Sequence, residues 1–338
     1  MALTVRFAPP STLPHAYAGA IFMTVANQGR LMNSRPAREG RRALPGPVGV
    51  IGAGKVGTAL AALLHARGVD VVAVAGRSLH DSRRMATSAG LSTHTAFTRA
   101  GTVATARIVF LAVPDDAIGP LCDEIAAHEG WRAGQGVVHC SGVLPSDVLQ
   151  AARDQGALVA SFHPLQTFAS LDAAIAHMPG STFALEGDPD LVSELELLVE
   201  LLGGAPLHLR AEEKTLYHAA ATIASNYTVT LVALAANLLV QESISPDANA
   251  ALRHLIPLLR GTIDNLDTLG LPGALTGALA RGDIGTVARH IEALQTCAPE
   301  TAGIYRHLAR LTLPLAQQKG RLDEETVDVL RKALSEQE

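Results

Sequence analysis

The chain has 338 residues, of which 48% are hydrophobic and 17% charged, with a formal net charge of −5. This length allows two globular domains, and the mildly acidic balance argues against a general nucleic-acid binder. The three cysteines form no Cys-x-x-Cys pair, which is typical of a reducing compartment and argues against a thiolate metal site, so we expect a cytoplasmic protein.

The first 44 residues differ from the rest. They carry six arginines against one acid, Glu39, and are interrupted by four prolines. An Arg-rich, acid-poor leader can be a transit peptide, but a secretion signal would place its basic cluster before the apolar run, and here the order is reversed. We expect residues 1–44 to be a disordered or mis-started tail, with Met23 or Met32 as the true start.

Between Pro45 and Leu209, short apolar runs alternate with helical stretches. The apolar runs cover 48–51, 71–75, 108–113, 137–139, 158–162, 182–185 and 206–209. The stretches with helical character cover 56–66, 116–129, 145–154 and 190–202. Continuous apolar strands that alternate with helices indicate a mostly parallel sheet covered on both faces. We therefore predict a doubly wound α/β domain of the Rossmann type over residues 45–209.

Strand signals end after Arg210. Residues 210–338 are expected to form an all-helical domain. Its helices are predicted at 211–242, 247–266, 284–297, 299–313 and 323–335, with Asp323 as a cap of the last. The longest apolar run, 228–240, is shorter than the roughly 18 residues that a membrane-spanning helix needs. We expect no membrane segment.

A Gly-x-Gly-x-x-Gly motif lies directly after the first predicted strand and directly before a helix. It comprises Gly52, Gly54, Lys55, Val56 and Gly57. The first glycine allows a tight turn, the second lets the backbone approach a pyrophosphate, and the third lets the helix pack close to the strand. Phosphates would lie at the helix N-terminus, where free N–H groups favour negative charge. The motif predicts a dinucleotide site.

The end of the second predicted strand indicates which dinucleotide is bound. NAD sites usually place an acid here to hold the ribose hydroxyls, but this chain has Arg77 and Ser78. An arginine can pair with a 2′-phosphate and a serine can hydrogen-bond to it. The pattern favours NADP, and the alternative is that Arg77 is a solvated loop residue.

The strand predicted at 108–113 ends at the same edge of the sheet. Ligands of open α/β sheets bind at the carboxyl ends of the strands, so Val113 and Pro114 are expected to flank the nicotinamide ribose. Asp115 or Asp116 is interpreted as the start of the next helix.

Three sets of polar residues are expected where a substrate would meet the nicotinamide. Two follow predicted strands, at 139–142 with Ser141 and at 161–166 with His163. The third lies on the long helix and comprises Lys214, Tyr217, His218, Ser225 and Asn226. Because a carbonyl or imine that receives a hydride needs a proton donor and a charge stabiliser, Lys214 and His218 are candidates for both roles.

Helix geometry supports this interpretation in part. At about 100° per residue, Lys214, His218 and Ser225 fall within roughly 20° of one line, while Asn226 lies about 100° off it. In the alternative, Lys214 is solvated near the helix start and His218 and Asn226 satisfy interdomain hydrogen bonds. His163 precedes a proline and is expected to point into the crevice, although a lone histidine is more often structural. No ligand spacing supports a metal site.

Taken together, these motifs resemble a family of bacterial Rossmann-like oxidoreductases with a C-terminal helical domain called domain of unknown function 2520. The resemblance runs from Pro47 to the C-terminus. It rests on the segments 52–57, 111–116, 139–142, 162–168, 214–226 and 275–283. The wider superfamily includes 6-phosphogluconate dehydrogenase, ketopantoate reductase and pyrroline-5-carboxylate reductase, and it implies a homodimer formed through the helical domain.

The resemblance does not carry over a substrate. In the hydroxyacid dehydrogenases of this superfamily a catalytic lysine is followed four residues later by asparagine, whereas Lys214 is followed by His218. The leading hypothesis is an NADP(H)-dependent oxidoreductase for a small, anionic carbonyl or imine. In it, Lys214 or His218 donates the proton, and Ser141, His163 and Asn226 orient the substrate. The alternatives are a non-catalytic NADP(H)-binding or sensing protein and a deazaflavin-dependent NADP reductase.

Overall fold

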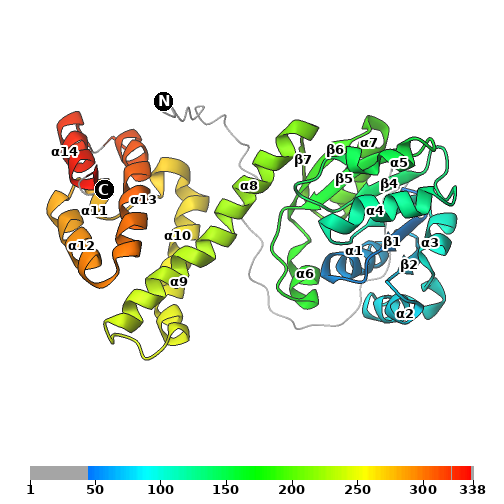
Figure 1. The fold of residues 1–338 in the computed structure, drawn as a ribbon, viewed down its shortest axis with the longest axis horizontal. Helices are drawn as coiled ribbons and strands as arrows, with labels where there is room; N and C mark the ends of the chain where they lie inside the picture. Colours follow the sequence, from blue (N-terminus) through cyan, green and yellow to red (C-terminus); the bar gives the residue numbers. More distant parts are fainter. Residues whose placement is uncertain (1–44, 321, 336–338) are drawn as a thin grey trace, which may run out of the picture. The chain divides into compact units, whose positions relative to one another are not determined.

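The computed structural model describes residues 45–320 and 322–335. The predictions for the tail 1–44 lie outside the described residues. Residues 45–320 and 322–335 belong to one compact unit. A sheet dominates the first part of this unit and helices make up the second (Figure 1).

The sheet has seven strands in the order β2-β1-β3-β4-β5-β6-β7. In chain order they are β1 (Val48–Ile51), β2 (Val71–Ala75), β3 (Ile108–Leu111), β4 (Gly136–His139), β5 (Leu158–Pro164), β6 (Thr182–Gly187) and β7 (Ala205–His208). All neighbouring pairs are parallel except β5 and β6, which are antiparallel. This confirms the predicted doubly wound, mostly parallel sheet.

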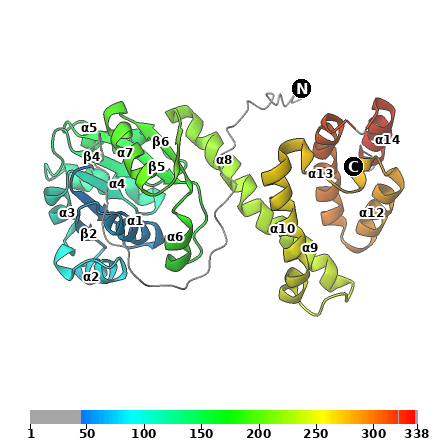
Figure 2. The same ribbon diagram turned by 180° about the vertical axis from the view of Figure 1, so that it is seen from behind.

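Helices cover both faces of the sheet (Figure 2). They are α1 (Lys55–Ala66), α2 (Leu79–Ser88), α3 (Arg99–Thr105), α4 (Asp115–Ala126), α5 (Gln150–Arg153), α6 (Leu171–His177) and α7 (Pro189–Leu201). Alternate strand residues supply two separate cores. Phe110 and Phe162 belong to the core that α1 and α7 cover, and Val109 and Leu111 belong to the core under α4. The continuous apolar strands are explained by this two-sided burial.

The second part contains only helices. They are α8 (Lys214–Ala224), α9 (Asn226–Gln241), α10 (Ala248–Gly273), α11 (Ala278–Arg281), α12 (Ile284–Cys297), α13 (Pro299–Gln318) and α14 (Glu324–Ser335). A small core with Val287, Leu313 and Leu330 holds the last helices together. The predicted cap is present, because the Asp323 carboxylate accepts a hydrogen bond from the Thr326 amide at 2.8 Å.

The predicted helix 211–242 is one long path with a local distortion. A short 3-10 turn (Ala211–Glu213) leads into α8, and Ser225 separates α8 from α9 with φ −108° and ψ −69°. Backbone hydrogen bonds continue across Ser225, so the helical path runs on from α8 into α9 (Figure 1).

The same helix is long and apolar. The helical path 211–241 contains an 18-residue window with a mean hydropathy of 1.6, so among the described residues it is long and apolar enough to cross a membrane by length and composition alone. A core or interface helix passes the same test, so this is weak evidence for a membrane. The shorter run 228–240 considered from the sequence alone underestimated the apolar stretch.

Candidate functional site

The glycine motif forms the tight turn between β1 and α1. Gly52 has φ +128°, and a Cβ there would lie 2.1 Å from the Ala112 carbonyl oxygen. A Cβ on Gly57 would lie 2.1 Å from the Gly52 carbonyl oxygen, so the third glycine lets α1 pack against the turn. A Cβ on Gly54 would meet nothing within 4 Å. The open side of Gly54 is therefore where a ligand could approach the backbone.

This turn fits a dinucleotide pyrophosphate. No acidic residue lies in the first turn of α1, and the first amides of any helix have no partner within it. A small cavity of about 180 Å³ adjoins the turn and is lined in part by Gly54, Lys55 and Arg84. The predicted cofactor residues Lys55 and Val56 begin α1 at this point.

The side chain of Lys55 links the glycine turn to a distant segment. Its Nζ donates a hydrogen bond to the Phe168 carbonyl oxygen at 3.2 Å. Phe168 follows β5 and lines a cavity of about 670 Å³ at this edge. The dinucleotide turn and that cavity are therefore neighbours.

Arg77 and Ser78 lie where β2 passes into α2, as the motif required. Ser78 caps α2, because its Oγ accepts a hydrogen bond from the Asp81 amide at 3.1 Å. The Asp81 carboxylate forms an ion pair with Arg84 at 3.2 Å, and the hydrogen bond from the Ser78 hydroxyl holds the pKa of Asp81 below its usual range. Arg77 is exposed and forms no salt bridge within residues 45–320 and 322–335.

Val113 and Pro114 lie directly after β3, and Pro114 is the N-cap residue of α4. Asp115 and Asp116 begin that helix, which confirms the structural role expected for them.

A row of buried polar residues crosses the sheet beside these turns. In the strand register His139 pairs with Ser161, and Ser161 pairs with Glu186. The exposed fractions of the three are 0%, 0% and 7%. Because directly paired residues point to the same face of a sheet, the three side chains lie side by side.

His139 is held in one tautomer. Its Nε2 donates to the Pro145 carbonyl at 3.2 Å, and its Nδ1 accepts from the Ser141 amide at 3.1 Å. Burial lowers its pKa to about 3. His139 is therefore a neutral residue that shapes the turn after β4.

Ser141 lies in that turn and is 4% exposed. Its Oγ accepts hydrogen bonds from the Val143 and Leu144 amides at 3.2 and 3.1 Å. Its carbonyl oxygen accepts from Lys214. Within the described residues the hydroxyl is thus engaged by the backbone, and Ser141 is absent from the lining of the large cavity.

Lys214 is fully buried, with an exposed fraction of 0%. Its Nζ donates to the Ser141 carbonyl at 3.1 Å and to the Ser161 Oγ at 2.8 Å. Burial lowers the pKa of this amine to about 8. The nearby Glu186 carboxylate acts in the opposite direction and raises the pKa. The alternative that Lys214 is solvated is wrong.

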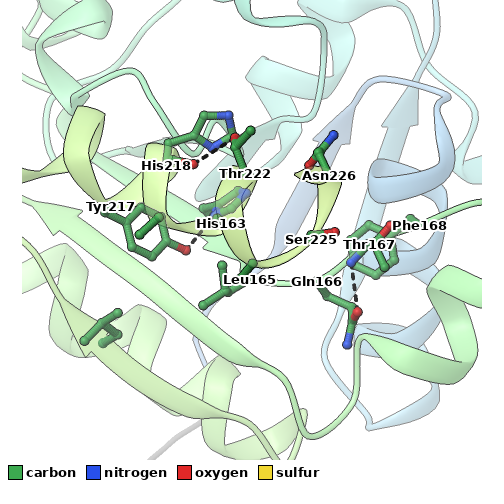
Figure 3. A pocket seen from close by; sticks show the side chains of 14 residues that line it. His163, Leu165, Gln166, Thr167, Phe168, Tyr217, His218, Thr222, Ser225 and Asn226 are labelled. Atoms are coloured by element: carbon green, nitrogen blue, oxygen red, sulfur yellow. Dashed lines mark hydrogen bonds between the residues drawn. The ribbon is translucent and has the colours of Figure 1, made fainter. Parts of the chain in front are cut away.

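The large cavity lies between the segment after β5 and the α8–α9 path, and its volume is about 670 Å³. Its polar lining brings together His163, Gln166, Thr167, Tyr217, His218, Thr222, Ser225 and Asn226 (Figure 3). The remaining lining is apolar and includes Leu165 and Phe168. Three predicted site residues, His163, His218 and Asn226, therefore share one cavity, whereas Lys214 and Ser141 lie outside its lining.

His163 and Tyr217 form a hydrogen-bonded pair in this cavity. The His163 Nδ1 and the Tyr217 hydroxyl are 2.8 Å apart. Burial lowers the pKa of His163 to about 4 and raises the pKa of Tyr217 to about 12. At neutral pH the pair is uncharged, and the phenol keeps its proton.

His218 packs edge-on against His163, with ring centroids 6.1 Å apart. Its Nδ1 is buried and has no hydrogen-bond partner among the described residues. Gly142 fits between the two rings, because a Cβ there would lie 2.8 Å from the His218 Nδ1 and 2.9 Å from the His163 Nε2. The turn after β4 therefore packs against both histidine rings through a glycine.

Glu186 lay outside the sets of site residues predicted from the sequence, whereas Gly142, Ser161 and Tyr217 belonged to those sets without a role of their own. Tyr217 was visible as a neighbour of His218 on the long helix. Glu186 had only a weak signal, an acid at the end of an apolar run, and its neighbours depend on the antiparallel pairing of β5 with β6. Among the described residues no group of three His, Cys, Asp or Glu residues is arranged to hold a metal ion.

Models of known protein families match both parts of the chain. A model described as a Rossmann-like domain matches residues 32–164, and the model of domain of unknown function 2520 matches residues 181–312. The second match begins at the strands β6 and β7 and extends through most of the helices. No curated protein matches the sequence.

Several solved structures share the fold. A protein from Thermotoga maritima is 24% identical with a TM-score of 0.63, covering 81% of this chain and 100% of that one. A proposed NADP oxidoreductase from Bacteroides fragilis is 24% identical with a TM-score of 0.60, covering 80% and 98%. An imine reductase from Myxococcus stipitatus, in complex with NADP+, is 21% identical with a TM-score of 0.52, covering 83% and 98%.

At these identities the likeness establishes the fold alone. The two family models and the sheet-then-helix architecture agree with the resemblance noted from the motifs. The chain therefore carries a Rossmann-like domain followed by a domain of unknown function 2520.

Proposed function

We propose that the protein is an NADP(H)-dependent oxidoreductase that transfers a hydride to or from a small carbonyl or imine compound. The observation that carries the proposal is the junction at one sheet edge. The glycine turn contacts Phe168 through Lys55, and Phe168 lines the cavity that also holds His163, Tyr217 and His218. A dinucleotide site thus adjoins a cavity with proton-bearing side chains.

The choice of NADP rests on the end of β2. Arg77 is free to pair with a 2′-phosphate, and Arg84 offsets the nearby charge of Asp81. Because an arginine binds phosphate in a bidentate manner, we assign Arg77 as the main 2′-phosphate ligand. Ser78 contributes less in this proposal, because its hydroxyl already caps α2. The bound cofactor supplies the hydride chemistry.

The cavity favours a small and largely neutral substrate group. Its volume of about 670 Å³ is in the range of small-molecule sites. Histidine, tyrosine, hydroxyl and amide groups supply its polarity, and no Lys, Arg, Asp or Glu belongs to its described lining. The expectation of an anionic substrate has no support from this lining, so we propose a carbonyl or imine without requiring a carboxylate.

We assign His218 as the proton donor. It lines the cavity, and an imidazole can carry and donate a proton to a substrate oxygen or nitrogen there. His163 and Tyr217 orient the substrate, together with Asn226 at the far end of the lining. Lys214 lies behind the cavity and contributes positive potential, while it holds the Ser141 turn in place.

Kinetics with a panel of small ketones, aldehydes and cyclic imines tests this function. We expect NADPH oxidation by the wild type, and a loss of kcat of about 100-fold or more in His218→Asn, because a positioned acid contributes that much. Tyr217→Phe, which keeps the aromatic ring in place, is the matched control for His218→Asn, and we expect it to lose less kcat. If no compound is turned over although NADPH binds, the protein is an NADP(H) sensor; if His218→Asn keeps the full rate, the assigned donor is wrong.

We further propose a cytoplasmic homodimer formed through the α8–α9 path. Leu216, Ile223 and Val229 of this path are 77%, 62% and 70% exposed, and apolar surface of this extent marks an interface. A second copy is favoured over a bilayer because the same helix carries Lys214 and His218 on its other side. Light scattering should give twice the chain mass of 35.2 kDa; a monomer, or a protein that needs detergent, would exclude the dimer.

A further inference from the structure

A carboxylate outside the proposed cofactor and substrate contacts is built into the same centre. Glu186 is 7% exposed. Its Oε2 accepts a hydrogen bond from the Ser146 amide at 2.8 Å, and its Oε1 accepts one from the Ser146 hydroxyl at 2.7 Å. An ionised carboxylate that is buried in this way loses its hydration, which is unfavourable unless a positive charge lies nearby.

The Ser161 hydroxyl connects this carboxylate to Lys214. Its Oγ is 3.2 Å from the Glu186 Oε2 and 2.8 Å from the Lys214 Nζ. A hydroxyl has one proton to donate, and a carboxylate can only accept. The Ser161 proton is therefore directed at Glu186, which leaves a lone pair of Oγ for the lysine amine.

The remaining titratable groups around Lys214 are neutral at ordinary pH, with one exception. Burial lowers the pKa of His139 to about 3 and that of His163 to about 4, and raises the pKa of the Cys140 thiol to about 12. The charge of the Asp115 carboxylate, at the start of α4, also acts on Lys214, but Asp115 is exposed to solvent. Glu186 is thus the buried negative charge next to the buried amine.

We propose that Glu186 is the counter-ion of Lys214, and that through the Ser161 hydroxyl it keeps the ammonium group charged and fixed against the Ser141 turn. Glu186 is a positioning residue in this scheme, and it also ties Ser146 to the sheet. The same charged pair therefore holds both ends of the 141–146 turn. Its part in catalysis rests on the proposed function, whereas its effect on Lys214 does not.

The ionisation of Lys214 can be measured directly. The chain contains only four lysines, Lys55, Lys214, Lys319 and Lys332, so protein labelled with 13C at the lysine Cε gives a simple NMR spectrum. The Lys214 signal is the one that disappears in Lys214→Met. We expect it to titrate near pH 8 in the wild type, and about one pH unit lower in Glu186→Gln, because an opposite charge is removed at close range.

Two further variants control the experiment. Asp115→Asn removes an exposed carboxylate and should move the Lys214 midpoint by less than half as much, because solvent screens that charge. Ser161→Ala removes the connecting hydroxyl while Glu186 stays, and should lower the midpoint as well. It also tests the proposal if Glu186→Gln fails to fold. An unchanged midpoint in the folded Glu186→Gln or Ser161→Ala protein, or a larger shift in Asp115→Asn, would overturn the proposal.

Turnover separates this inference from the proposed function. If Lys214 charge supports catalysis, the high-pH limb of kcat should move down with the NMR midpoint in Glu186→Gln. If the Lys214 midpoint shifts in Glu186→Gln but the wild type turns over no substrate, Glu186 is still the counter-ion of Lys214, and the proposed oxidoreductase function is wrong. If the pH dependence of kcat stays unchanged while the Lys214 midpoint shifts, Glu186 has no part in the reaction.

Discussion

Gly142 occupies a position where only a hydrogen atom fits between two rings. A Cβ would come within 2.8 Å of the His218 Nδ1 and 2.9 Å of the His163 Nε2. These contacts are shorter than any that packed atoms sustain, so the rings must separate or the turn must withdraw. The glycine therefore sets the distance between the two histidines of the cavity.

The variant Gly142→Ala tests this role. We expect kcat to fall about tenfold or more with unchanged NADPH affinity, because a small displacement of catalytic groups is costly whereas the glycine-rich turn is untouched. Stability should fall by about 1–3 kcal/mol, as in other overpacked sites. Gly303→Ala in α13 is the control, since a Cβ there meets nothing within 4 Å. Equal activity of Gly142→Ala and wild type would show that the ring spacing is unimportant.

At this scale the sequence predicted residue types better than their surroundings. The stripe of Lys214 and His218 was visible from helix periodicity, and both residues do face the sheet edge. Periodicity carries no information on depth, however, so it did not distinguish a buried Lys214 from a cavity-lining one. Glu186 could not be foreseen as its partner, because that contact depends on the β5–β6 register and on the Ser161 side chain.

Among the elements, the strands were the most predictable. Runs of branched apolar residues located every strand, and β2 was predicted at its observed bounds. The antiparallel direction of β6 was not predicted, since a strand buried on both faces has the same composition in either direction. Ser225 and Asn226 both line the cavity, although an ideal helix would place Asn226 about 100° from the line through Lys214 and His218.

The turn between β1 and α1 permits a paired test of packing and ligand approach. Gly57→Ala should lower the free energy of unfolding by about 3 kcal/mol, because its Cβ would meet the Gly52 carbonyl at 2.1 Å. Gly54→Ala should leave stability within about 0.5 kcal/mol but weaken NADPH binding about tenfold, since it fills the side where phosphate approaches. Chemical denaturation and NADPH titration measure the two quantities. A stable Gly57→Ala, or a Gly54→Ala with full affinity, would contradict the assignment of these glycines.

For the whole molecule, the alternation of strands and helices followed by helices alone predicted the architecture, because each layer requires its own hydrophobic period. The sheet ends at His208 and α8 begins at Lys214, close to the predicted change at Leu209. The sequence predicted that the polar residues at 161–166 and those of the long helix, more than 40 residues apart, would meet at a substrate site, but not which of them line the cavity or what shape it has.

The most direct test of the central claim is calorimetric titration of the full chain with NADPH and, separately, with NADH. We expect micromolar binding of NADPH and much weaker binding of NADH, with the difference largely lost in Arg77→Ala. Binding of neither cofactor would contradict the oxidoreductase proposal and leave a Rossmann-type domain with another purpose. Equal binding of both cofactors would retain the dinucleotide site and remove the role of Arg77.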